Sequence, residues 1–295
     1  MNFVYLEEGK TVFSIKKCFI AGWGTESGRE DGAIFLICRP DGEVLMPLGA
    51  TLGFPGWLQS DCPLLNWPRL FIGTLDGQPV YLIAAARETS APRHSEWVNI
   101  RNILGELEEG TLQAMCRASM LASWNNDHLF CGRCGDSMLL DADEAVRVCP
   151  ACNFRSYPTI SPVVIVRVVD GEKILLAHNR RFPGDRYSCV AGYVDAGETL
   201  ESAIIREVME EVGLKAAAPR YIGSQAWPFP HSLMIGFEAT ARGEPVPDGR
   251  EITDAQWFTP DVLPQLPPQG SIARALIDGW LANIGRQNPK EGVDT

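Results

Sequence analysis

Short hydrophobic runs separated by turn residues fill the first third of the chain. FVYL, AIFLICR, EVLMPLG, RLFIGTL and PVYLIAAA follow one another with Gly, Asp and Pro between them. Runs of this length between such residues are typical of β-strands joined by turns. Residues 1 to about 95 are therefore predicted to form a small sheet-rich domain, and this region carries no catalytic motif.

Hydrophobic residues then recur at helix-like intervals over residues 96–127, with one break near Gly110. This spacing predicts a helical segment that bridges two domains. The residues that carry the pattern are Ile103, Leu104, Leu107, Leu112, Met115, Ala118, Leu121 and Ala122.

The remaining pattern mixes strands and helices. PVVIVRVV, KILLAHN and SCVAGYV read as three strands, and LMIGFEAT and DAQWFTP as two later ones. A helix is predicted from about Leu200 to Val212, and the amphipathic run SIARALIDGWLANI predicts a second helix. The fold class is therefore predicted to be α+β. Residues 286–295 are predicted to form a flexible C-terminal tail.

Composition narrows the class of protein. The 295 residues are 45% hydrophobic, so the chain can bury the cores of two or three domains. The net charge of -11 disfavours general binding to double-stranded DNA or to an anionic membrane. No stretch approaches the roughly 20 apolar residues that span a bilayer, and Glu7 and Glu8 stand where a signal peptide would be basic. A cytoplasmic protein with no membrane partner is expected.

Four of the nine cysteines form two C-x-x-C pairs, in CGRCG at 131–135 and CPAC at 149–152. This spacing is close to that of a zinc ribbon, in which four thiolates surround one Zn²⁺ and leave no open position for chemistry. We expect one structural zinc ion per chain; two disulfides or a redox dithiol are the disfavoured alternatives. The expected ligands are Cys131, Cys134, Cys149 and Cys152.

The predicted helix 200–212 gathers three negative charges on one face. Glu207 lies one turn from both Glu210 and Glu211, and like charges at that spacing destabilise a helix by a few tenths of a kcal/mol per pair. A divalent cation such as Mg²⁺ or Mn²⁺ would turn this repulsion into attraction. The alternative is a solvated acidic face with Arg206 as a partial counter-charge.

The wider pattern decides between these two readings. It resembles the G-x5-E-x7-R-E-U-x-E-E-x-G-U box of the Nudix hydrolases, where U is a bulky aliphatic residue. The resemblance implies a Nudix fold, an α/β/α sandwich with a mixed sheet, that hydrolyses a nucleoside diphosphate linked to another group. The matching positions are Gly192, Glu198, Arg206, Glu207, Val208, Glu210, Glu211, Gly213 and Leu214.

The resemblance also implies roles for single residues. Glu207, Glu210 and Glu211 would bind Mg²⁺ or Mn²⁺, with Glu210 as a further ligand or the group that orients the attacking water. Arg206 would hold a glutamate in place. The carbonyl of Ala191 and the later Glu251 would complete the metal site, and Glu198 would be structural or an outer contact.

SQAWPFPHS, residues 224–232, resembles the S-Q-P-W-P-F-P-x-S array of the NADH pyrophosphatase branch, with an alanine in place of the first proline. Prolines restrict the residues before them, so an extended strip with presented rings is expected. A base stacks on such a ring for about 1–3 kcal/mol; the alternative is plain packing under a loop. The expected substrate contacts are Gln225, Ala226, Trp227, Pro228, Phe229, Pro230, His231 and Ser232.

Single residues elsewhere resemble further substrate contacts of that branch. They are Glu144 between the cysteine pairs, Tyr157 after them, and, as weaker matches, Arg101 and Ala273. A plain surface or packing role is the alternative for each. The basic stretch HNRRFPGDR at 178–186 is interpreted as a phosphate contact or, equally, a solvated loop.

Together these resemblances predict a metal-dependent enzyme that splits NADH or NAD⁺ into nicotinamide mononucleotide and AMP, with NAD caps on RNA 5′ ends as a further candidate substrate. The alternatives are a Nudix hydrolase for ADP-ribose or diadenosine polyphosphates, and an inactive zinc-ribbon module that binds nucleotide or RNA. The branch also implies a homodimer. The predicted boundaries are 1–127 for the N-terminal domain with its helical bridge, 128–157 for the zinc ribbon and 158–285 for the Nudix domain.

Overall fold

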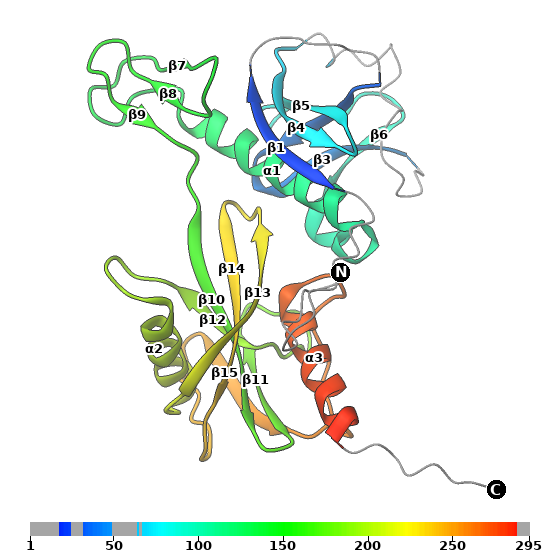
Figure 1. Ribbon diagram of the computed structural model, residues 1–295, viewed down its shortest axis with the longest axis vertical. Coiled ribbons are helices and arrows are strands. Elements are labelled where there is room, and N and C mark those ends of the chain that lie inside the picture. Colours follow the sequence, from blue (N-terminus) through cyan, green and yellow to red (C-terminus); the bar gives the residue numbers. More distant parts are fainter. Residues whose placement is uncertain (1–17, 25–31, 49–63, 65–66, 288–295) are drawn as a thin grey trace, which may run out of the picture. The chain divides into compact units, whose positions relative to one another are not determined.

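The computed structural model describes residues 18–24, 32–48, 64 and 67–287 (Figure 1). The chain forms two compact units. The C-terminal unit contains Ser161–Gln225 and the chain from Leu233 onward; the N-terminal unit contains the described residues up to Ile160 together with Ala226–Ser232. The predicted strand FVYL and residues 288–295 of the predicted tail lie outside the described residues.

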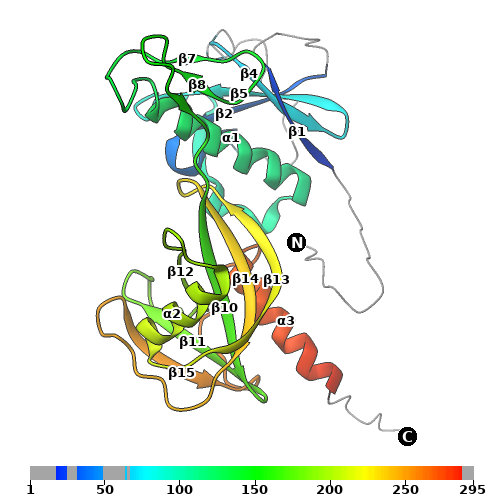
Figure 2. The ribbon, with the colours of Figure 1, turned by 60° about the vertical axis from the view of Figure 1, so that its left-hand side comes forward.

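The C-terminal unit has one sheet covered by two helices. The sheet order is β13-β14-β10-β11-β15, and β12 pairs with β10. The helices α2 and α3 lie on opposite faces of this sheet (Figures 1 and 2). The elements are β10 (Ser161–Asp170), β11 (Lys173–Asn179), β12 (Val190–Tyr193), α2 (Leu200–Val212), β13 (Ala217–Trp227), β14 (Ser232–Thr240), β15 (Ile252–Phe258) and α3 (Ile272–Gln287).

The alternating directions of the side chains along β10 explain why a helix packs on each face of the sheet. Val164, Val166 and Val168 belong to the cluster that packs on α2, whereas Ile165 belongs to the cluster that packs on α3. Because successive side chains of a strand point to opposite faces, one continuous hydrophobic run supplies both cores. The α/β/α sandwich predicted from the sequence is confirmed.

Arg167 is the polar exception in this strand. It is 1% exposed, and its Nε donates to Glu238 on β14 at 2.7 Å while its Nη1 donates to the carbonyl of Leu276 on α3 at 2.8 Å. The pairing compensates the cost of burying a guanidinium. Arg167 therefore ties three elements of the unit together.

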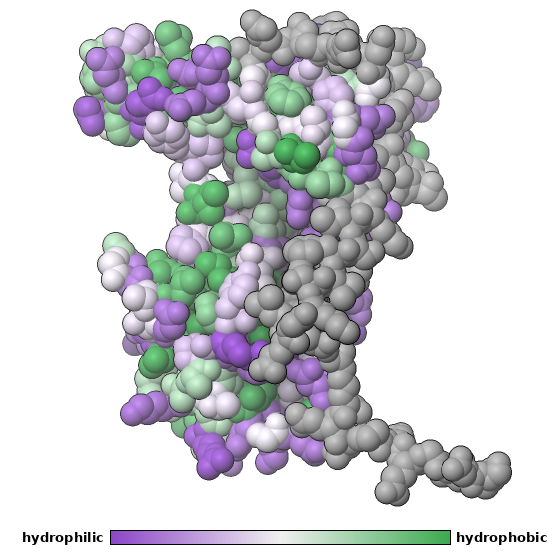
Figure 3. All heavy atoms as spheres, viewed as in Figure 1, coloured by the Kyte–Doolittle hydropathy of each residue, from purple (hydrophilic) through white to green (hydrophobic). Residues whose placement is uncertain are grey.

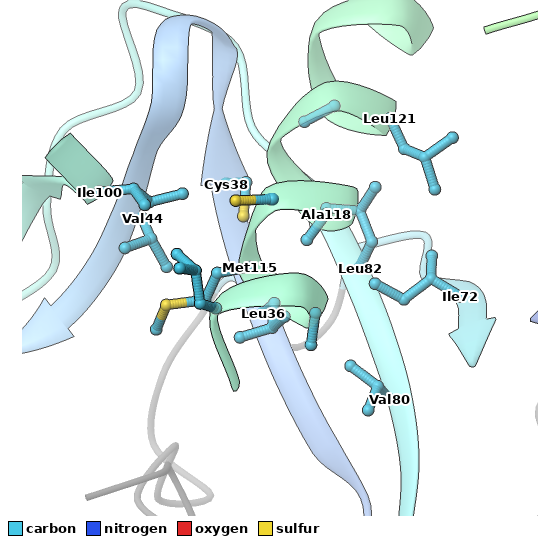
Figure 4. Packing of buried hydrophobic residues seen from close by; sticks show 14 of the residues in the cluster. Leu36, Cys38, Val44, Ile72, Val80, Leu82, Ile100, Met115, Ala118 and Leu121 are labelled. Carbon is cyan, nitrogen blue, oxygen red and sulfur yellow. The ribbon is translucent and has the colours of Figure 1, made fainter. Parts of the chain in front are cut away.

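The N-terminal unit is built on a second six-stranded sheet, with order β1-β4-β5-β2-β3-β6. Only β2 and β5 run parallel among these neighbours. One face packs against α1, where Leu36, Cys38 and Leu82 meet Met115 and Ala118 (Figure 4). The elements are β1 (Phe19–Gly24), β2 (Ile34–Arg39), β3 (Glu43–Pro47), β4 (Leu70–Leu75), β5 (Gln78–Ala84), β6 (Ser95–Asn99) and α1 (Glu109–Asp127).

The predicted helical segment 96–127 is wrong over its first part. Ser95–Asn99 is the strand β6, paired antiparallel with β3, and residues 100–106 form short 3-10 turns. The helix α1 begins at Glu109, so Gly110 lies in its first turn and is no break. Trp97 and Val98 have strong strand preference, and pairing with β3 decides the outcome.

A small three-stranded sheet follows α1, formed by β7 (Leu139–Leu140), β8 (Arg147–Val148) and β9 (Arg155–Ser156). One cysteine pair lies before β7 and the other lies between β8 and β9. Hydrophilic residues are spread over the face of both units that Figure 3 shows. Within the described part of the chain, no helix combines the length and the hydropathy needed to cross a membrane.

Candidate active site and zinc centre

The two cysteine pairs form two knuckles with the same backbone hydrogen bonds. Gly135 N–H donates to the Cys131 carbonyl at 2.8 Å, and Asn153 N–H donates to the Cys149 carbonyl at 2.9 Å. Gly135 and Asn153 both have positive φ, +81° and +55°, so each closes its knuckle in the left-handed region. Gly132, the other glycine of the first knuckle, has no positive φ.

The four thiol sulfurs converge. The Sγ atoms of Cys131 and Cys152 are 3.6 Å apart, and Cys134 lies 3.5 Å from both Cys149 and Cys152. Zn–S bonds of about 2.3 Å would place the sulfurs roughly 3.8 Å apart. All four cysteines are free thiols, which argues against the disulfide alternative. This donor set fits a tetrahedral zinc ion.

Arg206 hydrogen-bonds three carboxylates, one just before α2 and two on it. Its guanidinium makes a bidentate pair with Glu198, at 2.9 and 2.8 Å. Its Nη1 donates to Glu207 at 2.7 Å and to Glu210 at 3.3 Å, and its Nη2 donates to the carbonyl of Tyr193 at 2.9 Å. The pairing with Arg206 holds the pKa of Glu198 down at about 2. Arg206 therefore connects the helix to the loop before it.

Glu207 lies directly against the strand that precedes the helix. A Cβ built on Gly192 would be 1.9 Å from the Cδ of Glu207. Only a glycine leaves room for this carboxylate. Ala191, the residue before Gly192, is paired with Ile165 of β10, so the strand fixes its backbone beside the same carboxylate.

Glu211 is the most constrained carboxylate of the cluster. It is 8% exposed, and its Oε2 is buried without a hydrogen-bond partner among the described residues. Burial first, and then the charges of Glu207, Glu251, Asp248 and Glu210, raise its pKa to about 8. An unpaired buried carboxylate amid like charges is costly unless a cation is bound. The carboxylates of this cluster therefore fit a divalent cation.

Glu251, about 40 residues after α2 in the sequence, also belongs to this cluster, since its charge acts on Glu211. Asn179 Nδ2 donates to its Oε1 at 2.9 Å. Asp248 accepts three backbone N–H groups, from Arg250, Glu251 and Ile252, and so shapes the turn that presents Glu251. The sequence reasoning did not select Asp248 or Asn179. The signal for Asp248 was the Asp-Gly turn before Glu251.

The segment 225–232 is extended as far as Trp227, but the continuous extended strip that the prolines predicted is wrong beyond that residue. The strand β13 ends at Trp227, and a turn follows through His231. Phe229 N–H donates to the Trp227 carbonyl at 2.8 Å, and the Phe229–Pro230 peptide is cis. The reversal of the chain is imposed by the pairing of β13 with β14. The segment is therefore the tip of a hairpin.

Gln225 has both ends of its amide engaged. Its Nε2 donates to the Gly270 carbonyl and its Oε1 accepts from Ile272 N–H, each at 2.8 Å. Gln225 is 4% exposed, and Ala273 beside it on α3 is 9% exposed. Both residues lie in the C-terminal unit, where they connect β13 to the start of α3.

The rings of the hairpin tip pack within the N-terminal unit. Trp227 and Phe229 meet edge to face with centroids 5.0 Å apart, and the Arg101 guanidinium lies 4.3 Å from the Phe229 centroid and 5.6 Å from that of Trp227. Cys116 donates its thiol to the Ala226 carbonyl at 3.7 Å. The structure thus brings Arg101 together with the tip, through a cation–π contact.

Glu144 and Tyr157 are also brought together, through a residue that the sequence reasoning missed. Arg155 pairs with Glu144 at 2.6 Å and donates through Nε to the Tyr157 hydroxyl at 3.1 Å. Tyr157 is 55% exposed. Arg155 begins β9, and Tyr157 directly follows the last residue of that strand. The hydrogen bond between them puts the guanidinium beside the phenol.

Comparison with known proteins assigns all three parts of the chain. The NUDIX domain family matches residues 159–279, and the NADH pyrophosphatase zinc ribbon domain matches 126–157. The NADH pyrophosphatase-like rudimentary NUDIX domain matches 34–124, a relationship that no motif in those residues had indicated.

Individual proteins similar to this chain are also found. The NAD-capped RNA hydrolase NudC of Stutzerimonas stutzeri is 43% identical over 79% of this chain and 84% of its own. That of Pseudomonas fluorescens is 42% identical over 85% and 90%. A NUDIX hydrolase structure from Nitrosomonas europaea aligns with 56% of this chain and 96% of its own, at 20% identity and a TM-score of 0.46. The chain belongs to the Nudix hydrolases of the NADH pyrophosphatase type.

Proposed function

We propose that this chain hydrolyses the central pyrophosphate of NADH and NAD⁺, and that it removes NAD caps from RNA 5′ ends. The observation that carries this proposal is the similarity to proteins named NAD-capped RNA hydrolase over 79–85% of the chain. The intact carboxylate cluster supports a chain that is catalytically competent. Water adds to one phosphorus and the P–O–P bridge breaks. The free dinucleotide gives nicotinamide mononucleotide and AMP, and capped RNA gives nicotinamide mononucleotide and RNA with a 5′-monophosphate.

The carboxylates are proposed to hold Mg²⁺ or Mn²⁺. Glu207, Glu211 and Glu251, with the Ala191 carbonyl, are the proposed ligands, and Glu210 is a further ligand or orients the attacking water. When bound, the cations neutralise the pyrophosphate and lower the pKa of a bound water. Arg206 keeps Glu198, Glu207 and Glu210 in place through its hydrogen bonds.

Substrate contacts are proposed from two places in the N-terminal unit. One is the hairpin tip, Ala226–Ser232, with Arg101 over its rings. The other is the Glu144–Arg155–Tyr157 group, whose exposed phenol can stack on a base. Gln225 and Ala273 are proposed as further contacts from the C-terminal unit, and the engaged amide of Gln225 favours a positioning role over direct binding.

Zinc is proposed at one ion per chain, held by the four cysteines, with a role in folding alone. A homodimer and a cytoplasmic location stay predictions from the sequence and its resemblance. Sedimentation of the zinc-loaded chain tests the first, and metal analysis of the same sample tests the zinc content. A monomer at micromolar concentration contradicts the dimer.

The activity is tested with NADH, NAD⁺, NAD-capped RNA, ADP-ribose and diadenosine polyphosphates in Mg²⁺, with products separated by chromatography. We expect AMP from NADH and loss of AMP with Glu211→Gln. A clear preference for ADP-ribose or for diadenosine polyphosphates overturns the assigned substrate. Binding of RNA without turnover of any pyrophosphate would point to an inactive module.

A further inference from the structure

Two exposed arginines sit at the centre of a tight turn after β11. Phe182 N–H donates to the Asn179 carbonyl at 2.8 Å, which closes the turn over Arg180 and Arg181. Arg181 N–H donates to the Asn179 side chain at 2.9 Å, an arrangement that stiffens a turn. Both arginine side chains are exposed. The turn therefore presents two cations on a fixed backbone.

This turn is bonded to the segment that carries Glu251. Arg180 N–H donates to the Glu251 carbonyl at 2.9 Å, and its Nη2 donates to the Gly249 carbonyl at 2.8 Å. Asn179 adds the side-chain bond to Glu251. Glu251 in turn acts electrostatically on Glu211. Three hydrogen bonds thus place the two arginines beside the carboxylate cluster.

The nearby carboxylates are occupied by other groups. Asp248 accepts backbone N–H groups, and Glu251 accepts from Asn179. In the described part of the chain, no ion pair within 4.0 Å joins Arg180 or Arg181 to a carboxylate. The chain as a whole has a net charge of -11. Two adjacent arginines without a carboxylate partner among the described residues, beside an acidic centre, are suited to bind a ligand that is itself negatively charged. A guanidinium offers phosphate a planar set of donors.

We propose that Arg180 and Arg181 bind phosphodiester groups of the RNA that follows the NAD cap. The inference rests on the proposed function and extends it to the body of the substrate. Free NAD⁺ carries only the pyrophosphate, which the cations neutralise, whereas capped RNA carries further phosphates at each nucleotide. The turn would favour capped RNA over the free dinucleotide through charge alone, without reading sequence.

The test compares the double variant Arg180→Gln/Arg181→Gln with the wild type on free NAD⁺ and on an NAD-capped oligoribonucleotide. For capped RNA we expect kcat/KM to fall about tenfold, with the salt slope reduced by about 1.4 for two lost contacts. Hydrolysis of free NAD⁺ should fall far less than hydrolysis of capped RNA, because the variant loses the Arg180 bond to the Gly249 carbonyl but keeps the backbone bond to Glu251. Arg180→Lys/Arg181→Lys should retain most of the activity on RNA.

Arg93→Gln/Arg242→Gln is the matched control, because it removes the same charge from two other exposed arginines. An equal loss with this control would show a general charge effect and overturn the site. Equal losses on free NAD⁺ and capped RNA would overturn it as well, as would no loss on either. A wild type that hydrolyses neither substrate refutes the proposed function itself, which separates the two failures.

Discussion

The Glu207 carboxylate fills the space that a side chain at position 192 would need. A Cβ on Gly192 would lie 1.9 Å from its Cδ and 2.0 Å from its Oε1. Gly192 stands on β12 and Glu207 on α2, so the glycine sets how closely the helix carries its carboxylate to the strand.

Gly192→Ala is expected to reduce kcat by at least about a hundredfold, because a misplaced catalytic group loses much of its effect. The measurement is steady-state NADH hydrolysis in Mg²⁺, with circular dichroism to check folding. Gly132→Ala is the matched control, since a Cβ there meets nothing within 4 Å. Unchanged turnover in Gly192→Ala would contradict the role of this contact.

Glu211 should make the metal-free protein less stable as the pH rises. Its pKa goes from 4.5 to about 8 on folding, so folding favours the protonated carboxyl. This stability is present below pH 4.5 and is lost as the pH rises through about 8. Thermal unfolding in chelator between about pH 5 and about pH 9 measures the loss.

Two comparisons isolate the contribution of Glu211. Glu211→Gln should flatten the pH dependence in chelator, because an amide does not titrate. Mg²⁺ should stabilise the wild type most at the alkaline end, where the carboxylate is charged. If the variant and the wild type lose stability in parallel, the effect comes from other groups.

Removing one partner of the Arg167–Glu238 ion pair should lower the stability of the fold. Glu238→Gln leaves the guanidinium, which is 1% exposed, without its counter-charge. We expect a loss of about 3 kcal/mol in the free energy of unfolding, measured in urea. Replacing both residues, as Arg167→Met/Glu238→Leu, should recover most of it. If Glu238→Gln leaves the free energy of unfolding unchanged, the hydrogen bond to the Leu276 carbonyl is enough to stabilise buried Arg167.

Gly42 and Phe229 provide a test of the hairpin tip. A Cβ on Gly42 would lie 2.3 Å from Cε1 of Phe229, so Gly42→Ala should displace the ring. We expect a loss of about 1–3 kcal/mol in stability and a higher KM for NADH at unchanged kcat. Gly77→Ala is the control: Gly77 has nearly the same φ, +80° against +82°, but open space around it. Equal effects would mean that backbone strain alone is responsible.

Local spacing made part of the fold predictable. The helix α2 has the predicted ends, Leu200 and Val212, because the Thr199 side chain accepts from Ser202 N–H and Gly213 closes the helix at φ +67°. The segment 96–108 was misjudged because its hydrophobic spacing is compatible with a helix, whereas pairing with β3 makes part of it a strand. Strand preference depends on such partners more than helix preference does.

The sequence by itself determined the groups whose members are neighbours along the chain: the two cysteine pairs, and the glutamates that one helical turn puts on one face of α2. Only the tertiary structure decided which distant residues join them. It set Glu251 and Asp248 against Glu211, bonded Gln225 to the start of α3, and laid Arg101 over Phe229. Contacts between residues far apart in the chain leave no periodic trace in the sequence, because they depend on how packed elements meet.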